Sequence, residues 1–128
     1  MKKYVPFLFS LSVLAGCAAP SGQKVGYRQV SMKEAMSIME EESGYIILDV
    51  RTPEEFQGGH IPNAINVANE TIGSEDISEL PDKEQLILVY CRSGNRSRQA
   101  AGKLAALGYT NITEFGGIMD WPGETVAE

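Results

Sequence analysis

The residues best suited to chemistry lie in one short stretch of the sequence, around Cys91. Five residues able to bind an anion follow it directly: Arg92, Ser93, Gly94, Asn95 and Arg96. A thiol beside arginine at the start of a helix ionises readily, with a pKa of roughly 3.5–7.5 instead of about 8.5. Backbone N–H groups in such a turn converge on a common centre and attract negative charge. The stretch therefore predicts a catalytic thiolate at Cys91 in a loop that binds an anionic substrate.

The charge pattern favours this interpretation over a purely structural cysteine. A lone cysteine at a strand end is most often a small buried hydrophobe. Between Gln85 and Thr113, however, the sequence has four basic residues and no acidic one, in a chain with 17 acidic and 11 basic residues. A basic island in an acidic chain suits an anionic substrate.

A strand and a helix are expected to hold the cysteine between them. Leu86 to Tyr90 is a continuous apolar run, typical of a strand buried on both faces of a parallel sheet. Residues 97–107 place Ala100, Leu104 and Leu107 on one face of a helix. Parallel α/β sheets bind ligands at the carboxyl ends of their strands, and Cys91 would lie at such an end.

The remaining sequence alternates between strand-like and helix-like segments, which indicates an α/β domain with a mainly parallel sheet. Four further strands are expected, at 27–30, 45–50, 64–67 and 111–115. Further helices are expected from the N-cap Ser31 to Gly44, after the N-cap Thr52, near 74–80, and after a turn at Gly116-Gly117 as far as Trp121.

The N-terminus has the pattern of an export signal. Two lysines precede a mostly apolar run, Val5 to Ala15, that is too short to span a membrane. The residues Leu14-Ala15-Gly16-Cys17 resemble the lipobox of bacterial lipoproteins, in which cleavage before the cysteine is followed by diacylation of its sulfur, as with palmitate. This resemblance implies a signal peptide at 1–16, a lipidated Cys17 with a tether at 17–26, and a domain at 27–128. A plain signal peptide with a coincidental cysteine is the alternative.

Such a protein would be exported and anchored by its lipid to the bacterial cell membrane or outer membrane. Composition limits its class further: 128 residues, 43% hydrophobic and 22% charged, suffice for one globular domain. The net charge of −6 argues against nucleic-acid binding. With Cys17 lipidated, Cys91 is the only thiol, so no internal disulfide can form. Two cysteines and one histidine exclude a four-ligand Cys/His zinc site, and no metal or organic cofactor is expected.

Three separated motifs resemble those of the rhodanese family. Residues 49–56 (Asp-Val-Arg-Thr-Pro-Glu-Glu-Phe) and 59–64 (Gly-His-Ile-Pro-Asn-Ala) match its first signature. Residues 91–97 resemble its active-site loop, and Gly116-Gly117 with Trp121 its closing signature. The match runs from about Tyr27 to Trp121 and implies an α/β fold around a five-stranded parallel sheet.

The resemblance also implies an activity, that of a thiosulfate sulfurtransferase. Cys91 would become a persulfide, held by the backbone N–H groups of residues 92–96. Arg92 and Arg96 would favour the thiolate and a small anionic donor such as thiosulfate, and cyanide or a thiol would accept the sulfur. A monomer suffices for this reaction.

Three polar residues of the first signature are expected to be architectural: Asp49, Arg51 and His60. An Asp-x-Arg sequence at a strand end can pair with loop backbone. His60 is the only histidine, and nothing in the sequence places it beside Cys91, so it is not assigned as a general base.

Loop length separates two chemistries within this superfamily. Four residues stand between Cys91 and Arg96, whereas phosphatases and arsenate reductases of the same fold carry five, which widens the cradle for a tetrahedral oxyanion. The resemblance therefore implies sulfur transfer. In agreement with this, no acidic residue is expected near the loop to serve as a leaving-group acid. The alternatives are a sulfur-carrier or binding module with little turnover, a Cys-dependent phosphatase or arsenate reductase, and a redox sensor, which would lack a resolving cysteine.

Overall fold

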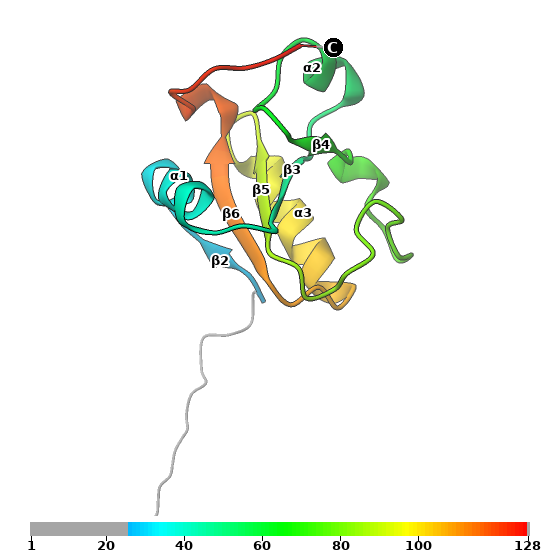
Figure 1. Cartoon of the computed structure of the whole chain (residues 1–128). Coiled ribbons are helices and arrows are strands. Elements are labelled where there is room, and N and C mark those ends of the chain that lie inside the picture. Colours follow the sequence, from blue (N-terminus) through cyan, green and yellow to red (C-terminus); the bar gives the residue numbers. More distant parts are fainter. Residues whose placement is uncertain (1–25, 128) are drawn as a thin grey trace, which may run out of the picture.

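The computed structural model describes residues 26–127, which build a five-stranded sheet with helices on both faces (Figure 1). Its strands are β2 (Arg28–Gln29), β3 (Ile46–Asp49), β4 (Ile65–Asn66), β5 (Ile87–Cys91) and β6 (Ile112–Gly117). They lie in the order β2-β6-β5-β3-β4, and every neighbouring pair is parallel. The predicted α/β fold and its parallel sheet are confirmed, and β5, which ends at Cys91, is the central strand.

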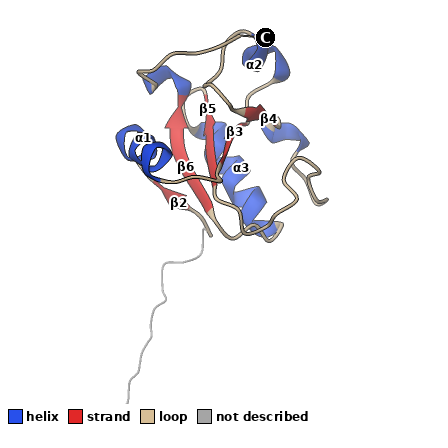
Figure 2. Cartoon of the chain, in the orientation of Figure 1, coloured by secondary structure: helices blue, strands red, loops and turns tan. Residues whose placement is uncertain are grey.

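Helices cover the sheet on both sides, as Figure 2 shows for α1 and α3. The helices are α1 (Met32–Glu41), α2 (Pro53–Gln57) and α3 (Asn95–Ala106), with two short 3₁₀ turns, η3 (Asn69–Thr71) and η4 (Ile118–Asp120). Between β5 and α3 lies a core that includes Val89 and Leu104, and on the α1 side a core that includes Leu88 and Phe115. All five residues of β5 are buried, as expected for a strand covered on both faces.

The predicted start of α2 is confirmed. Thr52 is its N-cap, and its hydroxyl accepts a hydrogen bond from the Glu55 N–H while the Glu55 carboxylate accepts one from the Thr52 N–H. Pro53 occupies the first turn, where its missing N–H costs nothing. This reciprocal cap fixes Glu55 at the carboxyl end of the sheet, because α2 directly follows β3.

Four predicted features differ from the structure by more than one residue at a boundary. No helix forms at 74–80. Residues 77–80 form a single turn instead, in which the Leu80 N–H donates to the Ile77 carbonyl. Helix α1 ends at Glu41 rather than at Gly44, since the acidic run at 40–42 opposes the negative end of the helix dipole.

The other two differences lie around the cysteine. Helix α3 begins at Asn95, two residues earlier than expected, because the loop after Cys91 runs directly into its first turn. Gly116 and Gly117 belong to the end of β6 rather than to a turn. In the structure, the start of α3 and the end of β6 therefore lie against one another beside Cys91.

The N-terminal predictions fall outside the part of the chain that the structure describes. They are the signal peptide at 1–16 and the lipidated Cys17. Within residues 26–127, no helix is long and apolar enough to cross a membrane.

Candidate active site

Cys91 lies at the carboxyl end of the central strand and is 1% exposed. The loop that follows folds back over it, so that the Gly94 N–H donates to the Cys91 Sγ at 3.0 Å. This requires the left-handed backbone of Gly94, whose φ is +112°, a conformation that residues with a side chain rarely adopt. Helix α3 then starts at Asn95 and directs its N-terminus at the sulfur.

The surroundings of Cys91 favour its thiolate. Burial raises the pKa of the Cys91 thiol. The hydrogen bond between Sγ and the Ser97 side chain, together with those from the backbone N–H groups of Ser97, Gly94 and Ser93, outweighs burial, and the pKa is lowered. Among residues 26–127, Cys91 is the one free cysteine. The arrangement can hold a negative charge on sulfur and, by the same N–H groups, on an atom bonded to it.

The two arginines of the loop have different surroundings. Arg96 makes a bidentate ion pair with Glu55, at 2.7 and 3.1 Å, and this pair lowers the pKa of Glu55 to about 2. Arg92 is exposed, and its guanidinium has no hydrogen-bond partner among the described residues. Arg92 is therefore the cation that remains available to an anionic donor, while Arg96 mainly ties the loop to α2.

The expectation that no acidic residue lies near the loop is wrong. Glu55 contacts the loop through Arg96. Glu114, on β6, is 2% exposed and accepts a hydrogen bond from the Ser97 hydroxyl, which itself lies 3.5 Å from the Cys91 Sγ. An acidic residue in the middle of a buried strand is uncommon, and this was the signal in the sequence that could have identified Glu114.

Other elements also fix the start of the loop, as Glu55 fixes its end at Arg96. The Met119 N–H donates to the Arg92 carbonyl at 3.2 Å. Gly117 of β6 lies so close to the Arg92 peptide that a Cβ at this position would be 1.9 Å from the Arg92 carbonyl oxygen. The two glycines that end β6 thus allow the loop to sit directly on the sheet.

Among the described residues, no hydrogen bond or ion pair joins Asp49, Arg51 or His60 to Cys91. These three residues contact backbone carbonyls and neighbouring side chains instead. Arg51 makes a buried ion pair with Asp49 at 2.8 Å and donates to the Gly59 carbonyl at 2.7 Å. The His60 ring stacks on Phe56 at a centroid distance of 3.7 Å, and its Nδ1 lies 2.8 Å from the Phe56 carbonyl oxygen. These contacts hold the chain between β3 and β4 in place.

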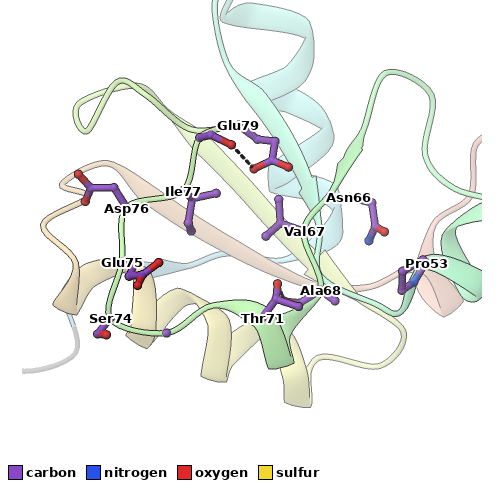
Figure 3. A pocket seen from close by; sticks show the side chains of 12 residues that line it. Pro53, Asn66, Val67, Ala68, Thr71, Ser74, Glu75, Asp76, Ile77 and Glu79 are labelled. Carbon is purple, nitrogen blue, oxygen red and sulfur yellow. Dashed lines mark hydrogen bonds between the residues drawn. The ribbon is translucent and has the colours of Figure 1, made fainter.

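A surface cavity lies elsewhere on the domain (Figure 3). It has a volume of about 490 Å³ and is formed by η3 and the loop at 73–79, at the β4 edge of the sheet. Glu75, Asp76 and Glu79 line it, and Cys91 does not. Its negative charge makes it unsuited to the anion that the cysteine loop can hold. No group of three His, Cys, Asp or Glu side chains in residues 26–127 could hold a metal ion.

The family model for the rhodanese-like domain matches residues 31–124. This chain belongs to the rhodanese family. The match includes the cysteine loop, the Asp49–Arg51 pair and the two glycines that end β6.

Several sulfurtransferases resemble this rhodanese domain. The thiosulfate sulfurtransferase PspE of Escherichia coli is 37% identical over 73 residues, which cover 57% of this chain and 70% of that protein. The thiosulfate sulfurtransferase GlpE of Pseudomonas entomophila is 31% identical over 104 residues, which cover 77% of this chain and 92% of that protein. Adenylyltransferase and sulfurtransferase UBA4 of Candida albicans is 42% identical over 100 residues, but the chain covers only 23% of its length.

Solved rhodanese structures share the fold. A rhodanese with anions from E. coli has a TM-score of 0.60 and 33% identity, and the match covers 66% of this chain and 99% of that one. The rhodanese-like domain of the Anabaena Alr3790 protein has a TM-score of 0.70 and 28% identity, over 78% of this chain and 79% of that one.

Proposed function

We propose that this rhodanese domain is a sulfurtransferase that carries sulfane sulfur as a persulfide on Cys91. The observation that supports it best is the Gly94 N–H on the Cys91 Sγ at 3.0 Å, at the N-terminus of α3, with the exposed Arg92 beside it. The names of PspE and GlpE, both thiosulfate sulfurtransferases, support a sulfane donor of this kind. Because Cys91 is only 1% exposed, a donor that presents a single small sulfur atom is best suited to reach it.

In the first step the Cys91 thiolate attacks the outer sulfur of thiosulfate. A bond forms between Sγ and that sulfur, the sulfur–sulfur bond of thiosulfate breaks, and sulfite leaves with its electron pair. The N–H groups that held the thiolate now face the persulfide anion. In the second step cyanide or a thiolate attacks the outer sulfur, and the Cys91 thiolate is released. Two half-reactions of this kind give ping-pong kinetics.

Intact-mass measurement tests this proposal. The full chain with Cys17→Ser leaves Cys91 as the only cysteine, and incubation with thiosulfate should add the mass of one sulfur atom. Cyanide should remove the added mass, and a Cys91→Ala variant should not gain it. Absence of the gain with thiosulfate and with persulfide donors would refute the proposal, and a gain without turnover would favour the carrier module instead.

A phosphatase or arsenate reductase remains the weaker proposal. The loop has four residues between Cys91 and Arg96, and Arg96 is engaged by Glu55. Hydrolysis of a phenyl phosphate that Cys91→Ser abolishes would favour it.

We also propose that the chain acts as a membrane-anchored, exported lipoprotein with a lipid on Cys17. The support is the lipobox-like sequence Leu14-Ala15-Gly16-Cys17 after an apolar run. Radiolabelled palmitate should enter the wild-type chain in a bacterial host but not a Cys17→Ser variant. Equal labelling of the two chains would overturn this proposal.

A further inference from the structure

Glu114 is a buried carboxylate without a cationic partner. It is 2% exposed, and no ion pair to it forms among the described residues. Its Oε2 accepts from the Ser97 hydroxyl at 2.5 Å and from the Gly116 N–H at 3.0 Å, and its Oε1 accepts from Gln29 Nε2 at 3.3 Å. Burial of an unpaired negative charge is costly, so this residue calls for an explanation beyond packing.

The Ser97 hydroxyl links this carboxylate to the reacting sulfur. Ser97 is fully buried, and its Oγ lies 2.5 Å from the Glu114 Oε2 and 3.5 Å from the Cys91 Sγ. The carbonyl oxygens of Gly94 and Gly116 are further acceptors, at 3.0 and 3.3 Å. A hydroxyl has one hydrogen, so Ser97 can donate to the carboxylate or to the sulfur but not to both.

This restriction couples the charges of Cys91 and Glu114. With Glu114 ionised, the Ser97 hydrogen points to the carboxylate, and the thiol S–H donates to the Ser97 Oγ. With Cys91 ionised, the Ser97 hydrogen points to the thiolate, and a protonated Glu114 donates to the Ser97 Oγ. In either state every hydrogen-bonding group is satisfied and the three residues carry one negative charge.

We propose that Glu114 is a positioning residue that acts through Ser97 as the proton acceptor of Cys91. The S–H bond breaks as an O–H bond forms on Ser97, and the original Ser97 O–H bond breaks as an O–H bond forms on Glu114. One proton leaves the sulfur, one reaches the carboxylate, the total charge is unchanged and nothing is oxidised. The role in sulfur transfer rests on the function proposed above, but the proton transfer itself does not.

The other charged groups near Cys91, Ser97 and Glu114 do not neutralise the negative charge that these three residues share. On strand β2, the neutral amide of Gln29 donates to Glu114, whereas the charged Arg28 donates to the Thr113 hydroxyl. Strand β5 contributes Cys91. On α3, the Arg98 guanidinium lies beside Gly94 and donates to an asparagine side chain, and Arg96 is held by a carboxylate of α2. The transfer therefore needs no solvent molecule and no further titratable group between sulfur and carboxylate.

The relay serves both half-reactions. Before the first step, it removes the thiol proton inside a buried site that water does not have to enter. In the second step, the Ser97 hydroxyl donates to Sγ as the sulfur leaves the persulfide, because Glu114 still holds the proton. The carboxylate thus takes up the thiol proton and returns it within the buried site.

A Glu114→Gln variant tests the proposal in the full chain with Cys17→Ser. The glutamine amide keeps the shape, removes the competing charge and can donate to the Ser97 Oγ, which directs the Ser97 hydrogen to Cys91. The Glu114 Oε2 lies 2.5 Å from the Ser97 Oγ, which lies 3.5 Å from the Cys91 Sγ, so the carboxylate charge is within about 6 Å of the sulfur. Loss of this charge should lower the thiol pKa by about one to two units. The pH profile of iodoacetamide alkylation should shift accordingly and become a single titration.

Two controls separate the relay from a structural role. Glu40→Gln, on the exposed face of α1, should leave the alkylation profile unchanged. In a Ser97→Ala background the hydroxyl link is absent, so Glu114→Gln should shift the profile by less than half as much. An equal shift in both backgrounds, or an unchanged profile in Glu114→Gln, would overturn the proposal.

A measurement on the unsubstituted relay covers the case in which these variants do not fold. Infrared difference spectra between free and Cys91-alkylated chain should show a protonated carboxyl that is present with the thiolate and lost on alkylation. A carboxylate that stays ionised beside the thiolate would refute the relay. Neither measurement uses a sulfur donor, so the relay and the sulfurtransferase proposal can fail independently.

Discussion

Gly117 supports the cysteine loop from below, and Gly117→Ala should therefore damage the site without touching the sulfur. The φ of Gly117 is −141°, which any residue adopts, so only the contact of the new Cβ matters. That Cβ would lie 1.9 Å from the Arg92 carbonyl oxygen and 2.5 Å from the Ser93 nitrogen. Real Cβ atoms essentially never approach closer than 3.0 Å, so the Arg92–Ser93 peptide must retreat by more than 1 Å.

Such a shift has two expected effects. Overpacking should cost about 1–3 kcal/mol of unfolding free energy, measured by urea denaturation. The Gly94 N–H, two residues beyond Arg92, should move from the Cys91 Sγ, and displacement of a catalytic group by about 1 Å lowers rates by about 10²-fold. The assay is the thiosulfate–cyanide rate together with iodoacetamide alkylation of Cys91 in the full chain with Cys17→Ser.

Gly102→Ala is the matched control. A Cβ at Gly102, within α3, would meet nothing within 4 Å, and replacing a helical glycine should add about 0.5–1 kcal/mol of stability with no loss of rate. A folded Gly117→Ala variant with a rate within about threefold of the parent would refute the argument, because the loop would then tolerate a displacement that should disrupt it.

Three further substitutions test the surrounding contacts. Asp49→Asn leaves the buried Arg51 without its partner and should cost about 3–5 kcal/mol in urea unfolding, with little effect on the rate of the protein that remains folded. Glu55→Gln removes the pair to Arg96, whose side chains are about 30% exposed, and should cost about 1 kcal/mol at pH 7. Since the pKa of Glu55 is lowered from 4.5 to about 2, this cost should be present above pH 4.5 and vanish as the pH falls toward 2, which urea midpoints at several pH values would show. Gly94→Ala forces a side chain into φ +112°, should cost about 1–2 kcal/mol, and should slow alkylation of the thiol.

The parts of this fold that depend on local pattern could be predicted from the sequence. The apolar run before Cys91 is the central strand β5, and the Thr52 cap with Pro53 starts α2 where expected. Each of these signals lies within a few residues and depends on propensity and capping alone.

The contacts that connect distant segments could not be predicted in this way. Glu55 and Arg96 are 41 positions apart, and Ser97 and Glu114 are 17 apart. Their meeting depends on which strands pair and in which register, including the irregularity between Val89 and Cys91 where β5 pairs with β6. A sequence pattern carries neither quantity, so the absence of acidic neighbours in the local sequence gave a wrong expectation for the loop.

The attachment of the loop at both ends also limits how this domain could evolve. Its first peptide is pinned between Gly117 and the Met119 N–H, and its last residue, Arg96, is bound to Glu55. A lineage that gained one residue in the loop, as the phosphatase-type cradle requires, could expand it only outward between these anchors. The insertion would lift the Gly94 N–H from the sulfur unless a second change released one anchor. A longer loop that keeps the Gly94 N–H on the sulfur therefore needs two coupled mutations in this scaffold, an insertion and the release of one anchor.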